Sequence, residues 1–386
     1  KAGDKTGYYL QGIMSFKIVE VKSSSELDRF IRLPWKIYKD YPNWVPPLIS
    51  ERKKFLNPQI NPFFDRAEVK LLIAEDKQGN PLGRIALVHD HIYQESYSKN
   101  TGILGMFETV DDENVSRLLF DEAKSWCAEK GFSKLIGPMS LSINHECGLM
   151  VEGFDRPPML GIPYNPRYYE KHFQEWGFDK SKDLVSFRLD LIKIPEYLQN
   201  AASKLEKRGR FKLRNLNLSK FEEELKIIWD IYNSAWDMNW GSVPMTHKEF
   251  AYAAREMKSF VNPEFCLIAE VKGEPVGFSL ALPDVNQVLI KLNGKLFPFG
   301  WAKFLWNKNK IDSYRVLTLG VKKRFRRLGI DAYMYYETYK RFIRDGIGWC
   351  EMSWMLEDNA DIMEPMFKIG GTIYKRHRIY ERSFSP

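Results

Sequence analysis

Cysteine is scarce in this sequence, and long apolar runs are missing. Four of the 386 residues are cysteines, and no two are spaced as C-x-x-C. This argues against a disulfide framework and against a cysteine-rich zinc site, and it fits a reducing compartment. No apolar run approaches the roughly 18–20 residues that span a bilayer, and no secretory signal pattern is visible. We therefore expect a cytoplasmic protein.

Histidine is also sparse, with six residues of which only His89 and His91 lie close together. On a strand these two would share a face, but no third ligand is near in the sequence. A bound metal usually needs three or four protein ligands. We therefore predict no metal site.

Apolar and aromatic residues are plentiful, and the charge balance is basic. Hydrophobic residues make up 44% of the chain and include 11 tryptophans, which is enough to build the two or three domains that the length predicts. The net charge of +8 admits nucleic acid, anionic membrane surfaces or phosphorylated ligands. Residues 7–12 (GYYLQG) resemble a protease-site remnant. Residues 1–13 are therefore expected to be a tag or a disordered end.

An internal repeat organises the chain. The segment LIAEDKQGNPLG at residues 72–83 resembles LIAEVKGEPVG at 267–277. Three separate features match at one offset of 194 residues: Trp35 with Trp229, Gly83 with Gly277, and Gly177 with Gly371. Hairpin and helix-end patterns recur by chance in α/β proteins, but three matches at one offset favour duplication. We predict one unit over 14–192 and a second over 193–386. Each copy carries an insertion of 21 residues, near 145–165 and near 289–310, where specificity tends to lie.

Each copy predicts the same order of elements. In the second copy, apolar residues at three- and four-residue steps predict a helix over 221–236. Other predicted elements are strands at 265–271, 276–282, 315–321 and 348–355, helices at 331–344 and from 359, and two short strands in 372–384. In the first copy they are strands at 71–75, 82–89, 105–109, 135–137 and 184–190, and helices at 115–130 and 166–176. The fold class is α/β, with two tandem units, each a mixed, mostly antiparallel sheet flanked by helices.

The strongest chemical signal is a glycine-containing basic loop between a strand and a helix. It reads Val321-Lys-Lys-Arg-Phe-Arg326-Arg-Leu-Gly329-Ile-Asp331. Backbone N–H groups at a helix start are unsatisfied and carry partial positive charge, so this junction predicts a pyrophosphate site. The spacing matches neither a P-loop nor the dinucleotide G-x-G-x-x-G motif. The alternative is a basic surface turn.

Here the sequence resembles the GNAT superfamily of acyl-CoA-dependent N-acyltransferases, whose signature is R/Q-x-x-G-x-G/A after a strand ending in Val. Arg326, Gly329 and the strand residue Val321 match, whereas Asp331 stands where the family has Gly or Ala. The resemblance covers the second copy and, through the repeat, most of the first. It implies acetyl-CoA or another acyl-CoA as co-substrate and an amine-bearing acceptor. The implied cofactor-binding residues are Leu319, Val321, Arg326, Arg327, Leu328, Gly329, Ile330, Asp331 and Asn359.

Two departures from the family matter. A carboxylate at Asp331 would repel a pyrophosphate unless it points away as a helix cap. Where the family carries a tyrosine general acid, this chain has Met366 and Phe367. The first copy departs further, because acids (Val110-Asp-Asp-Glu113) follow its strand in place of glycine and basic residues. We predict that the first copy does not bind CoA.

Acyl transfer to an amine needs a base to remove a proton from the ammonium group. The catalytic candidates by position are Glu351, Glu270 and Glu249, although the pattern favours a surface or structural acid for each. An aromatic cluster after the first helix of the second copy predicts an acceptor pocket or a packed helix turn. Its residues are Asn233, Trp236, Asn239 and Trp240.

Three functions remain open from the sequence. The first is an acyl-CoA-dependent N-acyltransferase that binds CoA in its C-terminal unit. The second is a tandem-GNAT transferase that uses aminoacyl-tRNA, which is the one reading that would involve nucleic acid. The third is a non-catalytic acyl-CoA-binding protein, which the departures at Asp331 and Met366 would allow.

Overall fold

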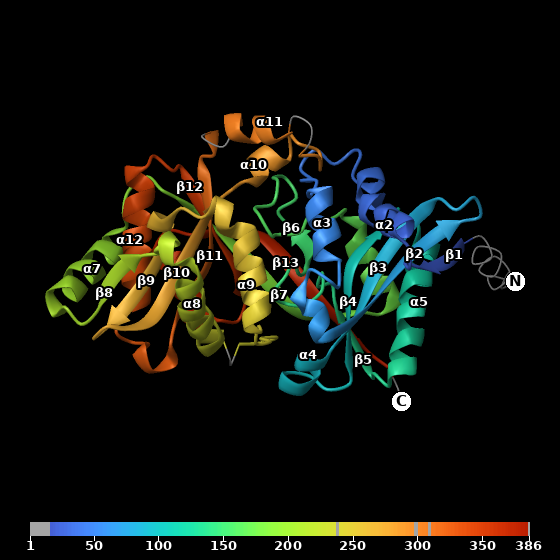
Figure 1. Ribbon diagram of the computed structural model, residues 1–386, viewed down its shortest axis with the longest axis horizontal. Helices are drawn as coiled ribbons and strands as arrows, with labels where there is room; N and C mark the ends of the chain where they lie inside the picture. The colour runs from blue at the N-terminus through green and yellow to red at the C-terminus, as the bar shows by residue number, and fades with distance from the viewer. Residues whose placement is uncertain (1–15, 237–238, 297–299, 308–309, 385–386) are drawn as a thin grey trace, which may run out of the picture. The chain divides into compact units, whose positions relative to one another are not determined.

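The computed structural model describes residues 16–236, 239–296, 300–307 and 310–384 (Figure 1). The predicted tag at residues 1–13 lies outside this range. The chain divides into two compact units. Unit 1 comprises residues 1–183, 292–300 and 377–386, and unit 2 comprises residues 184–291 and 301–376.

Unit 1 is built on a mostly antiparallel sheet in the order β1-β2-β3-β4-β5, with β4 and β5 as a parallel pair. The last residues of β13 extend it antiparallel to β5, where Tyr380 pairs with Gly137. The strands are β1 (Phe16–Glu20), β2 (Ala67–Asp76), β3 (Pro81–Asp90), β4 (Thr101–Thr109), β5 (Lys134–Gly137) and β6 (Leu149–Glu152).

The helices of unit 1 lie against both faces of this sheet. Phe120 and Trp126 of α5 and Phe173 of α6 form one core with apolar strand residues, while α2 contacts β3 and β4. Local signals set their ends: α5 ends at Gly131, which adopts a left-handed φ of 72°. The helices are α2 (Ser24–Ile37), α3 (Ile49–Phe55), α4 (His91–Ser96), α5 (Glu113–Lys130) and α6 (Tyr168–Trp176).

Unit 2 repeats this plan with the strand order β7-β12-β11-β10-β9-β8, in which β11 and β12 are the parallel pair. The predicted hairpin corresponds to β9 and β10. The strands are β7 (Asp179–Asp190), β8 (Lys212–Asn215), β9 (Cys266–Val271), β10 (Glu274–Pro283), β11 (Ser313–Val321), β12 (Trp349–Leu356) and β13 (Thr372–Ser383).

Two helical layers cover the sheet of unit 2. On one face, Phe342 of α12 and Met366 of α13 pack with Val316 and Met352. On the other face, Ile228 and Ile231 of α8 pack on Ile268 and Phe278. The helices are α7 (Glu196–Arg208), α8 (Phe221–Trp236), α9 (His247–Met257), α10 (Asn286–Leu289), α11 (Gly300–Asn307), α12 (Ile330–Arg344) and α13 (Ala360–Lys368).

Each unit is completed by a strand segment that the sequence repeat assigned to the other copy. Residues 184–190, the predicted closing strand of the first copy, pair with β12 and bury Val185, Phe187 and Leu189 in unit 2. Residues 377–383 close unit 1. The expected boundary at 192/193 therefore falls after the chain has already entered unit 2. The prediction of two short strands in 372–384 is wrong, because β13 is one strand without a breaking residue.

Unit 1 should depend on the last strand of the chain. Tyr380 is 1% exposed, and its ring lies 5.2 Å from that of Phe173. Replacing Tyr380 with Ala should remove about 3–5 kcal/mol from the free energy of unfolding of unit 1, because it empties a core position. Urea unfolding combined with amide exchange on β4 and β5 measures this. Tyr197→Ala, which changes a half-exposed ring, is the matched control. Unchanged protection of β5 in Tyr380→Ala would contradict the strand assignment.

Candidate functional site

The basic loop of unit 2 leads into a helix start that no side chain caps. β11 ends at Val321, and α12 begins at Ile330 after Gly329, which has a left-handed φ of 79°. In the described part of the chain, no side chain accepts a hydrogen bond from the first amides of α12. Because these amides point out of the helix and its dipole is positive here, the junction can receive an anion.

The basic side chains of this loop differ in their contacts. The Arg326 guanidinium donates to the carbonyl oxygen of Ala235 at 2.6 Å and to that of Val321 at 3.3 Å, so it ties the loop to the end of α8. Lys322 pairs with Asp230 at 2.6 Å. Arg327 is exposed, as is Asp331 in the first turn of α12. Asp331 does not cap the helix, and its carboxylate is open to water.

Beside the loop, one edge of β11 has no strand partner. The parallel pairing with β12 runs from Ser313 to Val316 and stops where Val316 meets Met352. On the β10 side the register shifts between Leu280 and Ala281. Within the described residues, the backbone of 317–319 therefore faces no strand on its β12 side. An extended ligand can hydrogen-bond to such an edge as an added strand.

In unit 1 the helix start and the strand edge that correspond to these two features are both occupied by the unit's own residues. The Asp112 side chain accepts from the Asn114 backbone N–H at 2.9 Å, so α5 carries its own acidic cap. The Met139 N–H donates to the Leu104 carbonyl at 2.9 Å. A Cβ at Gly105 would overlap the carbonyl oxygen of Met139. Beyond the point where β4 stops pairing with β5, the backbone of Met139 therefore fills the space beside β4.

A buried polar cluster lies on the α8 face of the unit 2 sheet. Glu351 is fully buried, and its carboxylate accepts hydrogen bonds from the Ser353 and Tyr374 hydroxyls. Arg315, also buried, lies 3.7 Å from Glu351 and donates to Ser353 at 2.9 Å. Burial and then the Glu351 charge raise the pKa of Tyr374, so its hydroxyl keeps its proton.

Asp284 completes this cluster at the end of β10. It is 8% exposed, and its Oδ1 has no hydrogen-bond partner among the described residues. Burial, followed by the nearby charge of Glu351, raises the pKa of Asp284 to about 7. A carboxyl with a pKa near neutrality can exchange a proton with a ligand under physiological conditions.

Sequence reasoning placed Glu351 among the candidates but missed its partners. Charged residues inside apolar strands, Arg315 in β11 and Glu351 in β12, were the available signal. The other two acids have local tasks: Glu249 closes a capping box with Thr246 at the start of α9, and Glu270 pairs with Arg214 at 2.6 Å.

The structure describes most of the predicted acceptor cluster and the predicted cofactor contact Asn359. The Asn233 amide exchanges hydrogen bonds with the backbone of Met245 at 3.0 and 3.1 Å. Asn239 and Trp240 are half-buried, and the side chain of Trp236 lies outside the described residues. Asn359 precedes α13, and in the described structure its side chain does not cap that helix. Asn233 therefore holds the α8–α9 connection together.

Unit 1 has its own pocket and a half-buried carboxylate. Glu108 accepts hydrogen bonds from the Tyr38 and Tyr169 hydroxyls, both at 2.8 Å, and burial raises its pKa. A pocket of about 390 Å³ lies nearby, and its lining residues are Tyr41, Phe154, Asp155, Tyr164, Arg167 and Tyr168.

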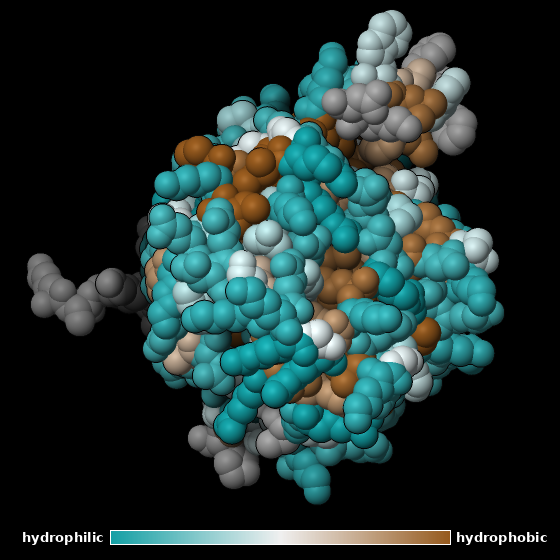
Figure 2. Space-filling view, turned by 90° about the vertical axis from the view of Figure 1, so that its left-hand side faces the viewer, coloured by the Kyte–Doolittle hydropathy of each residue, from teal (hydrophilic) through white to brown (hydrophobic). Residues whose placement is uncertain are grey.

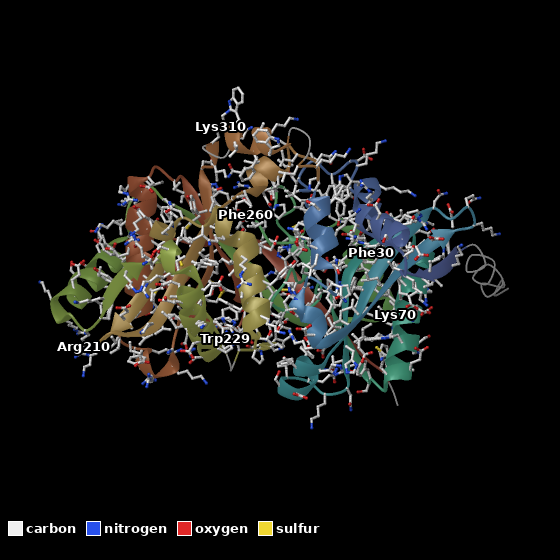
Figure 3. The ribbon with its side chains drawn as sticks, viewed as in Figure 1. Phe30, Lys70, Arg210, Trp229, Phe260 and Lys310 are labelled. Atoms are coloured by element: carbon white, nitrogen blue, oxygen red, sulfur yellow. The ribbon has the colours of Figure 1, made fainter. Side chains whose placement is uncertain are left out.

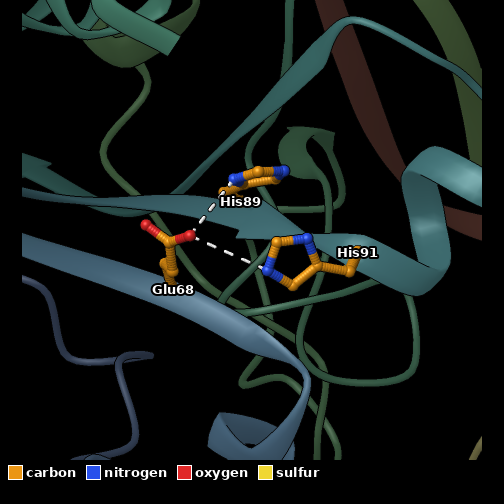
Figure 4. A group of neighbouring side chains, drawn as sticks. All are labelled: Glu68, His89 and His91. Carbon is orange, nitrogen blue, oxygen red and sulfur yellow. Dashed lines mark ion pairs between the residues drawn. The ribbon is translucent and has the colours of Figure 1, made fainter.

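The two neighbouring histidines do meet a third polar group. Glu68 on β2 lies opposite His89 on β3, and its Oε1 is 3.6 Å from His89 and 3.7 Å from His91 (Figure 4). His91 begins α4, just beyond the end of β3. The Lys130 ammonium already sits 2.6 Å from the same carboxylate. A resident cation therefore balances this group, and the absence of a metal stays a prediction.

Two known proteins are similar to the chain along almost their whole lengths. It is 38% identical over 371 residues to "Protein YghO" of Escherichia coli, covering 93% of each sequence. It is 37% identical over 374 residues to "Bacterial ceramide synthase" of Caulobacter vibrioides, covering 95% of this chain and 97% of that protein. No family model matches the chain.

The fold also has solved counterparts. A tandem GNAT protein from the clavulanic acid biosynthesis pathway superposes with a TM-score of 0.57 at 11% identity, covering 96% of this chain and 99% of that chain. At this identity the likeness speaks for the fold alone. The tandem GNAT fold indicated by the loop motif and the repeat is confirmed.

The Asp284 carboxyl should make unit 2 less stable as pH rises. Its pKa of about 7 lies above its ordinary value of 3.8, so between these values the folded state keeps a proton that the unfolded state has lost. The free energy of unfolding should then fall with rising pH, by at most about 4 kcal/mol.

Urea titrations across this pH range test the effect. Asp284→Asn should flatten the pH dependence, whereas Asp312→Asn, which removes only a minor contribution to the raised pKa of Asp284, should flatten it far less. If the free energy of unfolding of Asp284→Asn still falls with rising pH, another titrating group causes the pH dependence.

Proposed function

This chain belongs to the family that contains YghO and bacterial ceramide synthase, and on that premise we propose that it is an acyl-CoA-dependent N-acyltransferase whose C-terminal unit binds CoA. The observation that carries the proposal is the uncapped start of α12 beside the unpartnered edge of β11. The amides of 326–331 would hold the pyrophosphate, and the pantetheine arm would run along 317–321 as an added strand.

The contrast between the units supports the choice of unit 2. A second anion at α5 would meet the Asp112 carboxylate, and a pantetheine beside β4 would meet the backbone of Met139. In the described residues of unit 2, no acidic side chain caps the start of α12, and no strand pairs with β11 beyond Val316 on its β12 side. The tandem layout would then leave one CoA site per chain.

The name of one relative suggests the acceptor. A ceramide is the amide of a fatty acid and a long-chain amino alcohol, and the Caulobacter relative is named as a ceramide synthase. We propose a long-chain amine as the acceptor class and a fatty acyl-CoA as the donor.

The polar cluster offers a route for the protons. An ammonium acceptor must lose a proton before its nitrogen can attack the thioester carbonyl. We assign that proton to Asp284, whose Oδ1 is unpartnered and whose pKa is near neutrality. The neutral amine then attacks, the C–N bond forms and the C–S bond breaks. The nitrogen loses its second proton to the departing sulfur, so CoA leaves as its thiol, while the first proton stays on Asp284 until it passes to solvent. Glu351 would position Tyr374 and Ser353 around this point.

A direct assay tests the function. The protein is incubated with fatty acyl-CoA and a long-chain amino alcohol, and thiol release and amide mass are followed. Equal amounts of both products are expected. Acyl transfer from aminoacyl-tRNA but not from acyl-CoA would overturn the proposal in favour of the tRNA reading. CoA binding without thiol release across an amine panel would overturn it in favour of a non-catalytic binding protein.

Adding a side chain at Gly329 should weaken CoA binding. The residue has a positive φ, and a Cβ would come within 2.8 Å of the Leu205 side chain, so Ala would displace the amides that precede α12. We expect the Kd for CoA to rise about tenfold in Gly329→Ala. Calorimetric titration measures it. Gly346→Ala, at the other end of α12 and also with a positive φ, should leave the Kd unchanged. Equal losses in both variants would contradict the loop assignment.

Removing the Asp284 carboxylate should slow chemistry without changing CoA affinity. Asp284→Asn keeps the shape of the side chain but cannot accept the proton, so kcat should fall by about a hundredfold or more. Asp312→Asn is the control. A normal kcat in Asp284→Asn would show that another group, or water, removes the proton.

A further inference from the structure

A short helix in the insertion of unit 2 exposes large apolar side chains. Trp301, Leu305 and Trp306 of α11 are 50%, 52% and 80% exposed. Exposed tryptophans are uncommon in soluble domains unless the surface contacts something. Figure 2 shows brown and pale surface at the top of the view, beside atoms drawn in grey, at the height where Figure 1 draws α11.

The helix is held by its opposite side. At 100° per residue, Trp301, Leu305 and Trp306 fall on one arc, and Phe304 falls outside it. The Phe304 ring lies 5.8 Å from that of Phe260, which Figure 3 labels on unit 2 below the helix. The apolar arc is therefore not what attaches α11 to the unit.

The sequence in and around this helix carries charge of one sign. Residues 291–310 contain five lysines and no acid. At 100° per residue, Lys303 falls next to the apolar arc on α11. Lys310, labelled in Figure 3, lies just beyond the end of the helix. Both are exposed. No helix of the described chain is long and apolar enough to cross a membrane.

From these observations we propose that α11 docks the protein on the surface of an anionic lipid bilayer. Tryptophan rings settle at the boundary between headgroups and acyl chains, and lysines beside them attract anionic headgroups. A second copy of the chain is a poor occupant, because its lysines would meet these lysines. This proposal does not depend on the proposed function, since it concerns a surface and not a reaction.

Vesicle co-sedimentation of the full chain, without substrates, tests the proposal. The protein should sediment with vesicles of phosphatidylcholine and phosphatidylglycerol, less with phosphatidylcholine alone, and less again at high salt. A Trp301→Ser/Trp306→Ser variant should lose most of this binding, by about tenfold or more in partition. Lys303→Glu/Lys310→Glu should lose the preference for phosphatidylglycerol while keeping some binding.

The controls separate docking from folding. Tyr197→Ser, at a half-exposed aromatic on α7, should bind vesicles as the parent does. The tryptophan variant should keep the parent melting temperature, because Trp301 is half exposed and Trp306 is 80% exposed. Vesicle binding that is unchanged in the tryptophan variant would overturn the proposal. The proposal would also be overturned if the parent chain did not bind vesicles but formed a dimer, and if the tryptophan variant did not form that dimer.

Discussion

The parallel ladder between β11 and β12 ends at Val316 and Met352, and the features of unit 2 that bear on function depend on that ending. Beyond it, the backbone of β11 keeps its hydrogen-bonding groups on an edge without a strand partner. The strand then leads into the loop at 322–329 and the uncapped start of α12. Backbone groups of this kind need partners, and under our proposal an extended, anion-bearing ligand would supply them.

The same constraint has a different outcome in unit 1. There the ladder of β4 and β5 also stops early, after Ile103 meets Ile136, but Met139 hydrogen-bonds to Leu104 and fills the space. Asp112 then occupies the helix start that an anion would need. In unit 1 the chain's own backbone therefore covers the edge of β4, whereas in unit 2 the corresponding edge of β11 has no strand partner among the described residues.

The charged groups beside the ladder follow from burial. Cys350 and Met352 of β12 face the α12 layer, so the intervening Glu351 faces the opposite side, where Arg315, Ser353 and Tyr374 surround it. A buried carboxylate is costly unless it is paired and hydrogen-bonded, and this one is both. Asp284 lies near it, and burial, followed by the charge of Glu351, raises the pKa of Asp284 to about 7.

The sequence by itself determined the tandem repeat, the α/β class and the basic loop, because periodicity, glycine positions and loop chemistry are local. It could not place the strand that closes each unit: Val185 and Tyr380 read as ordinary apolar strand residues, and only their burial assigns them to one core or the other. Nor could it bring Asp284, Arg315, Glu351 and Tyr374 together, since they come from four different strands or their ends. Tertiary structure decided these points, because strand pairing and burial depend on residues far apart in the chain.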